Sequence, residues 1–172
     1  MSMETIYLKG DGRIPNSRLP VLIYRGVANV HVVEIEQCLR GNDWPPEWHT
    51  SYGMYPRHHF HSDAHELIVV TRGSLTCRFG GEAGVDAQME AGDVVVIPAG
   101  VGHFGNSISD DLRLIGAFPL GCAIHDFRLG DPAEYGRMVE RAQRVPVPGK
   151  DPWFGAVGPL IDIWSEAAKG VQ

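Results

Sequence analysis

The pattern that most limits the fold of this chain lies between residues 59 and 120, where short apolar runs alternate with glycine and proline turns. Residues 74–79 (SLTCRF) alternate apolar and polar side chains with a period of two, as a half-buried strand does. Residues 66–72, 94–98 and 111–120 are apolar enough to form further strands, and 94–98 is apolar on both faces. Strands at this spacing, with turn residues between them, predict an antiparallel sandwich or barrel.

Two turns are expected inside this region. Arg72-Gly73 is read as the tight turn of a hairpin that joins 66–73 to 74–81. The stretch 99–107 (AGVGHFGNS) is read as a glycine-rich turn that leads the chain back.

The segment before the barrel is mixed. Residues 1–18 are polar and rich in turn formers, and 19–27 predict a strand. Residues 28–40 predict a helix, because apolar side chains recur every three to four residues before Gly41-Asn42, although VHVVEI within them could form a strand. Pro45-Pro46 is expected to exclude regular structure. The aromatic residues that follow either line a pocket mouth or plug one end of the barrel: Trp44, Trp48, Tyr52 and Tyr55.

The segment after the barrel predicts helix. Asp131-Pro132 is a fitting helix start, and AEYGRMVERAQRV carries an apolar stripe. The apolar residues of 153–164 are expected to lie back on the barrel or on a second subunit. We treat residues 1–172 as a single domain, with a core barrel at about 50–120.

Composition narrows the partners and the compartment. The net charge of -6, without a cluster of Lys and Arg, argues against nucleic acid and anionic membranes. We expect no membrane span and no signal peptide, because no apolar run fits either. Three widely spaced cysteines suit reduced thiols, so we expect a cytoplasmic protein.

Histidines gather in the stretch from Gly53 to Gly73. His59 and His61 are two residues apart, so in an extended chain they share a face and can bind one ion. Glu66 follows a turn and could reach the same ion, and His103 would come from another strand pair across the barrel. Three imidazoles and one carboxylate suit Mn, Fe, Co, Ni, Cu or Zn better than Ca or Mg.

Other histidines compete for these roles. If Glu66 points inward, its neighbour His65 points outward, but a bulge before them would reverse the two and give a site of four histidines. His58 is expected to face away from the ion. The remaining histidines are isolated in the sequence and are not expected to be ligands: His31, His49 and His125.

Four arginines lie near the barrel strands: Arg57, Arg72, Arg78 and Arg113. One of them, if it pointed inward, would suit an anionic substrate. For each arginine, a solvated face is the simpler expectation.

Two motifs in the order expected of one family carry a resemblance. Gly53-(five residues)-His59-Phe60-His61-(four residues)-Glu66-(six residues)-Gly73 is similar to the first cupin motif. Gly92-(five residues)-Pro98-Ala99-Gly100-(two residues)-His103 is similar to the second, except that Asn106 comes one residue early. The whole chain resembles a narrower group, the YjlB-like single-domain cupins.

This resemblance implies a mainly β jelly-roll barrel with a few peripheral helices in the N- and C-terminal regions. It implies an ion bound by His59, His61, Glu66 and His103, with His65 as the rival of Glu66. The ion would be one divalent transition metal: Fe, Mn, Ni, Zn or Co.

We expect a metal-dependent, dioxygenase-like oxidoreductase that acts on a small chelating molecule. The alternatives are a metal-dependent isomerase or decarboxylase, and a non-catalytic cupin that binds a sugar or acid around a structural metal. Single-domain cupins commonly pair, so we also expect a homodimer.

Overall fold

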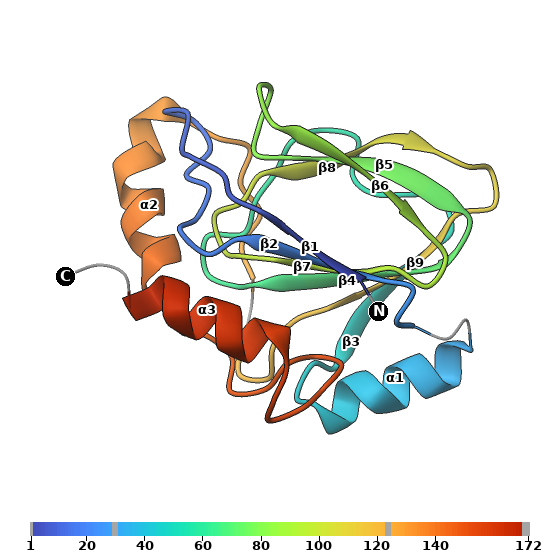
Figure 1. The fold of residues 1–172 in the computed structure, drawn as a ribbon. Coiled ribbons are helices and arrows are strands. Elements are labelled where there is room, and N and C mark those ends of the chain that lie inside the picture. Colours follow the sequence, from blue (N-terminus) through green and yellow to red (C-terminus); the bar gives the residue numbers. More distant parts are fainter. Residues whose placement is uncertain (1, 29–30, 123–124, 170–172) are drawn as a thin grey trace.

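The computed structural model describes residues 2–28, 31–122 and 125–169. Two antiparallel sheets face each other, with helices packed outside (Figure 1). The larger sheet has the order β1 (Ser2–Ile6), β2 (Val21–Arg25), β7 (Val94–Ile97), β4 (Glu66–Arg72), β9 (Arg113–Ala117), β3 (Pro46–Thr50). The smaller has the order β6 (Val85–Glu90), β5 (Ser74–Phe79), β8 (His103–Ile108). The helical elements are α1 (Val32–Gly41), η1 (Pro132–Glu134), α2 (Tyr135–Gln143) and α3 (Pro159–Lys169).

The four central strands of the larger sheet are buried on both faces, which explains their continuous apolar runs: β2, β7, β4 and β9. In β4, Leu67 and Val69 pack with α1 and α3, whereas Ile68 and Val70 point into the space between the two sheets. Figure 1 shows the two helices on one side of this sheet and β5, β6 and β8 on the other. A strand with apolar residues on both faces has to lie inside such a layered arrangement. The strand β5 is buried on one face only, so its apolar residues alternate with polar ones.

The mainly β jelly-roll class is confirmed, as are the peripheral helices. Residues 32–41 form helix rather than strand, and positions 29 and 30 of the predicted helix lie outside the described residues. Asp131 caps the next helical segment, because its side chain accepts a hydrogen bond from the backbone N–H of Ala133 at 2.9 Å. In the C-terminal apolar segment, Leu160 and Trp164 are fully buried against the larger sheet, as expected if the segment lies back on the barrel.

The predicted hairpin is wrong. The strands β4 and β5 follow each other directly, but β4 pairs with β7 and β9, whereas β5 pairs with β6 and β8. Gly73, with φ of 72°, turns the chain from one sheet into the other. The two strands are patterned differently, and this is the physical reason. The strand β4 is apolar on both faces and is buried within the larger sheet, whereas β5 alternates and lies in the smaller sheet, where one face is buried.

Three segments that were expected to be turn-rich or irregular form strands. Residues 103–108 of the glycine-rich stretch form β8, and the pairing with β5 skips Asn106, so the early asparagine sits at a bulge. The strand β3 begins at Pro46, because an edge strand tolerates proline as its first residue. The polar N-terminal segment contributes β1, which is also an edge strand.

No helix within the described ranges is long and apolar enough to cross a membrane.

Candidate metal centre

The site is assembled from both sheets and one extended segment. His59 pairs with His103 in an antiparallel bridge, with N–O distances of 3.3 and 2.9 Å. His61 lies two residues further along and turns its ring to the same side, whereas Phe60 between them packs with Ile14 and Met138.

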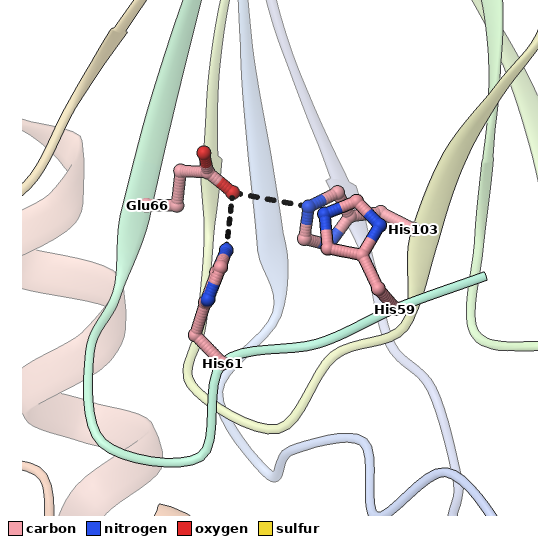
Figure 2. A group of neighbouring side chains, drawn as sticks. All are labelled: His59, His61, Glu66 and His103. Carbon is pink, nitrogen blue, oxygen red and sulfur yellow. Dashed lines mark ion pairs between the residues drawn. The ribbon is translucent and has the colours of Figure 1, made fainter. Parts of the chain in front are cut away.

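The other two residues come from the sheets. Glu66 is the first residue of β4 and His103 the first of β8. Figure 2 shows the four side chains converging.

Distances within the group are short. One ligand atom from each of the four residues lies within 4.8 Å of all the others. Glu66 Oε2 is 3.0 Å from His103 Nε2 and 3.3 Å from His61 Nε2. All four side chains are buried, with exposed fractions of 7% or less. A metal ion about 2.1 Å from each donor would place neighbouring donors about 3 Å apart, so the group fits one ion.

Backbone carbonyls orient the three imidazoles. Nδ1 of His59 lies 3.2 Å from the carbonyl of Arg57, Nδ1 of His103 lies 3.1 Å from that of Val101, and Nδ1 of His61 bonds the carbonyl of Asp126. A carbonyl only accepts, so Nδ1 carries the proton in each ring. In the neutral ring, Nε2 therefore presents a lone pair to the centre, which is the arrangement of a histidine that binds metal.

Two polar atoms at the centre lack a partner. Glu66 Oε2 and His103 Nε2 are buried and form no hydrogen bond within the described part of the chain. They lie 3.0 Å apart, but with the His103 proton on Nδ1 both atoms are acceptors, so no hydrogen bond joins them. Leaving buried polar atoms unpaired costs about 1–3 kcal/mol each. A cation between them would remove that cost, so the residues fit a metal ion.

Electrostatics favour a positive charge here. Burial lowers the pKa of His59 to about 3, so this ring is neutral at neutral pH. Burial also acts to raise the pKa of Glu66, but the neighbouring rings of His103 and His61 outweigh it, and the pKa falls well below its ordinary value. For His61, burial lowers the pKa while Glu66 raises it more, so the pKa rises overall. The Glu66 carboxylate therefore stabilises a positive charge beside it.

His65, the rival of Glu66, lies elsewhere. Its Nδ1 accepts a hydrogen bond from the N–H of Ala99 at 3.0 Å, and its Nε2 lies 3.1 Å from the carbonyl of Pro146. Its ring contacts Trp164 on the helix side of the larger sheet. Both nitrogens are thus occupied by the backbone, and the strand alternation that points Glu66 inward points His65 outward.

The other histidines are also outside the group of four. His58 packs edge-on against Phe104, with ring centres 4.4 Å apart. His31 precedes α1 as its N-cap residue. His49 and His125, which were not expected to be ligands, are not among the four, but both line the pocket beside the site.

A pocket of about 450 Å³ opens onto the four residues. Its walls are largely aromatic: Trp48, Tyr52, Tyr55, Phe118 and Phe127. The pocket-mouth interpretation thus holds for three of the four residues named from sequence, whereas Trp44 is fully buried in the core between the larger sheet and the helices. Among the described lining residues there is no lysine or arginine.

The four arginines considered from sequence point elsewhere. Arg72 pairs with Asp111 and Arg78 with Asp86, both on the surface. Arg113 bonds backbone carbonyls, and Arg57 is exposed. The solvated interpretation is therefore confirmed for this group.

A larger groove of about 890 Å³ lies away from the histidines, along β5 and β6 beside Arg25 and Asp93. Arg25 pairs with Asp93 at 2.7 Å, so the charges of these two residues are satisfied. The smaller pocket, with its unpaired buried atoms, is the better candidate for chemistry.

Part of the pocket wall was missed from sequence. Phe127 stacks on His59 with ring centres 4.5 Å apart, and His125 stacks on Phe118 at 3.8 Å. The Asp126 carboxylate fixes this segment by accepting hydrogen bonds from the N–H and hydroxyl of Ser62 at 2.6 and 2.7 Å. The only local signal was the aromatic composition of 125–127, since no motif includes these residues.

Comparison with known proteins agrees with the two motifs. Residues 48–115 match the family model described as "Cupin domain". The chain is also 35% identical over 162 residues to "Uncharacterized protein YjlB" of Bacillus subtilis (strain 168), covering 94% of this chain and 96% of that protein. The chain belongs to the cupin family. This cupin therefore shares nearly its whole length with the YjlB protein, which confirms the narrower resemblance.

Some solved structures are similar over part of the chain. Acireductone dioxygenase from Bacillus anthracis is 18% identical, with a TM-score of 0.38, over 55% of this cupin and 62% of that chain. A DUF861 family protein from Thermotoga maritima is 19% identical, with a TM-score of 0.37, over 57% and 98%. A deletion mutant of oxalate decarboxylase from Bacillus subtilis is 19% identical, with a TM-score of 0.38, over 63% and 28%. The family assignment rests on the sequence matches, and these likenesses add nothing on activity.

Proposed function

We propose that this cupin is a metal-dependent enzyme with dioxygenase-like chemistry, acting on a small chelating molecule. The observation that carries the proposal is the pair of unpartnered buried atoms, Glu66 Oε2 and His103 Nε2, at the centre of three oriented imidazoles. His59, His61, Glu66 and His103 would hold the ion. Fe, Mn, Ni, Zn and Co all suit this donor set.

A bound ion would act as a Lewis acid and as a template for a chelating substrate. The chain's own residues do the rest. The carbonyls of Arg57, Asp126 and Val101 keep the three rings oriented. The ring of Phe127 stacks on that of His59 and forms part of the pocket wall beside the centre.

The pocket favours an enzyme over a structural metal. A metal that only stabilised the barrel would be expected in a closed apolar site, whereas these ligands line a pocket of about 450 Å³. Polar groups that are not among the four also face this pocket, including His125, which pairs with Glu47 at 3.6 Å. Such groups beside a metal are what proton transfer to or from a substrate requires.

The lining also bears on the substrate. Aromatic walls without a lysine or arginine among the described lining residues favour an uncharged, flat molecule over a free acid. Two neighbouring oxygens, as in an adjacent hydroxyl and keto group or a diphenol, would let such a molecule chelate the ion. Isomerisation or decarboxylation with Mn, Ni or Zn, and simple binding of a sugar or acid, are the competing functions.

Metal content tests the site. Protein purified without oxygen should carry about one transition metal per chain by elemental analysis. The double variant His61→Ala and His103→Ala should carry none, because it removes two of four donors. The matched control His49→Ala changes an exposed histidine outside the group and should keep its metal. Wild type that contains no metal and takes up none on reconstitution would refute the assignment.

Oxygen consumption tests the reaction. The metal-loaded protein should consume O2 with one or more uncharged chelators from a panel of phenols, sugars, thiols and acids. Turnover without O2 consumption would indicate the isomerase or decarboxylase function. Binding of a compound without turnover would indicate the non-catalytic function, in which the cupin only binds a sugar or acid.

We also propose that the protein works in the cytoplasm, without nucleic acid or membrane as a partner. The three free cysteines and the net charge of -6 support this proposal.

A further inference from the structure

Trp48 is the feature that the proposed function leaves unexplained. It lies on the edge strand β3, yet its indole Nε1–H donates a hydrogen bond to Glu66 Oε1 at 3.2 Å. Glu66 belongs to β4, and β9 runs between these two strands. The indole therefore crosses a whole strand to reach a carboxylate of the candidate metal centre.

The strand that is crossed has a glycine at the crossing point. Gly116 of β9 pairs with Trp48 on one side and with Ile68 on the other, so the three residues share one face of the sheet. Glu66, two residues before Ile68, shares that face as well. A Cβ at Gly116 would fall inside the Trp48 ring. Gly116 does not have a positive φ, so the backbone does not require glycine here, and the space for the indole does.

The two oxygens of Glu66 consequently have different surroundings. Oε1 accepts from the indole, whereas Oε2 faces His61 and His103 and has no hydrogen bond within the described residues. A carboxylate with one oxygen engaged by an N–H donor offers the other oxygen alone to a cation.

We propose that Trp48 is a positioning residue for the metal centre: its indole N–H, seated over Gly116, holds Glu66 as a ligand through one oxygen only. This inference rests on the proposed function, because it needs an ion at the four residues. A carboxylate that bound through one oxygen would leave the ion one more coordination position than a carboxylate that bound through both. Trp48 also lines that pocket, so the same side chain shapes the substrate wall and sets the number of open positions.

Two variants remove the interaction by different routes. Trp48→Phe keeps an aromatic ring and deletes the N–H donor. Gly116→Ala keeps the indole and displaces it. The matched controls are Trp153→Phe, outside the pocket, and Gly136→Ala, where an added Cβ meets nothing within 4 Å.

The probe is Mn²⁺ alone, added to metal-free protein. We expect both variants to bind Mn²⁺ about 10- to 100-fold more weakly than wild type, and both controls to match wild type. Infrared difference spectra report the second consequence: the separation of the two carboxylate stretching bands on Mn²⁺ binding should narrow in Trp48→Phe, as Glu66 becomes free to bind through both oxygens. A residue that only packs the pocket wall would not move this separation.

The outcomes separate the two proposals. If wild type binds no Mn²⁺, the proposed metal site fails. If wild type binds Mn²⁺ and folded Trp48→Phe binds it equally well with unchanged carboxylate bands, the positioning role is wrong and the metal site stands. If Gly116→Ala does not fold, Trp48→Phe decides the question alone.

Discussion

Asp151 is a buried carboxylate. Its replacement should destabilise the fold by an amount that depends on how many of its hydrogen bonds are lost. It is fully buried and accepts four hydrogen bonds. Oδ1 accepts from the N–H groups of Trp153 and Phe154 at 2.8 and 3.0 Å, and Oδ2 accepts from the Tyr24 hydroxyl at 2.8 Å and the N–H of Leu160 at 3.0 Å. These bonds tie the start of α3 to β2, so Asp151 anchors the helix layer to the larger sheet.

The loss of folding free energy in Asp151→Ala follows from the hydrogen-bond donors that it leaves without an acceptor. The Tyr24 hydroxyl and the Leu160 amide belong to fully buried residues, and each unsatisfied donor costs about 1–3 kcal/mol. The amides of Trp153 and Phe154 belong to partly exposed residues and can turn to water. We therefore expect a loss of about 4 kcal/mol, which corresponds to a fall in Tm of about 12 °C for a chain of this length.

Two milder variants should lose less folding free energy than Asp151→Ala. Asp151→Asn keeps one carbonyl oxygen but turns an NH2 group toward donors, and should cost about 2 kcal/mol. Tyr24→Phe deletes one bond and leaves the carboxylate with three amide donors, so it should also cost about 2 kcal/mol.

Urea unfolding followed by circular dichroism measures the three losses, with the denaturant slope checked for constancy. The competing view is that the desolvation free energy of a buried charge without a cationic partner is as large as the stabilisation from its hydrogen bonds. If Asp151→Asn proved as stable as wild type or more stable, that view would hold and the reasoning above would be refuted.

The remaining predictions concern the site, the thiols and the assembly. Asp126→Ala should weaken metal binding about 10-fold in competition with a chelating dye, because the segment that orients His61 is released; unchanged affinity would contradict this. Metal-free protein should unfold at a lower Tm, and metal at one hundred times its Kd should restore about 2.7 kcal/mol; equal Tm values with and without metal would count against a folded-state site. Cys77 is buried, and burial raises its pKa, so its thiol should react with Ellman's reagent only after unfolding; fast labelling of the native protein would show the core to be open. We also expect a homodimer, since β1 is an edge strand with one free side in the described structure; sedimentation of a monomer at micromolar concentration would exclude it.

Local patterns in the sequence predicted three of the four converging residues, His59, His61 and Glu66. His59 and His61 share a face by strand alternation, and the same alternation separates Glu66 from His65. The long-range step, from this segment to His103, came from the cupin motifs and not from periodicity. The observed bridge between His59 and His103 is the physical form of that step.

Pairing partners were predicted less well, because they depend on sheets that the sequence does not display. The turn at Gly73 is as compatible with a hairpin as with a crossing from one sheet to the other, and only the burial of β4 on both faces decides between them. Pro46 and Gly105 were taken as breakers of structure, although an edge strand and a bulged strand accommodate them.

The pocket wall illustrates a second limit. Phe118, His125 and Phe127 come together with Trp48 although some 70 residues or more separate them in the chain. No alternation or motif links such positions, because a pocket is defined by tertiary packing. His125 consequently looked isolated in the sequence.

The origin of this wall has a consequence for how the protein could change. The four candidate ligands lie within residues 59–103, whereas the aromatic side chains around them come mainly from residues 48–55 and 118–127. Libraries that diversify only these two segments, sparing Trp48 and Asp126, would alter the shape of the pocket and leave every metal donor in place. Related chains could diverge along the same route, exchanging one substrate for another while the inorganic chemistry of the centre is inherited intact.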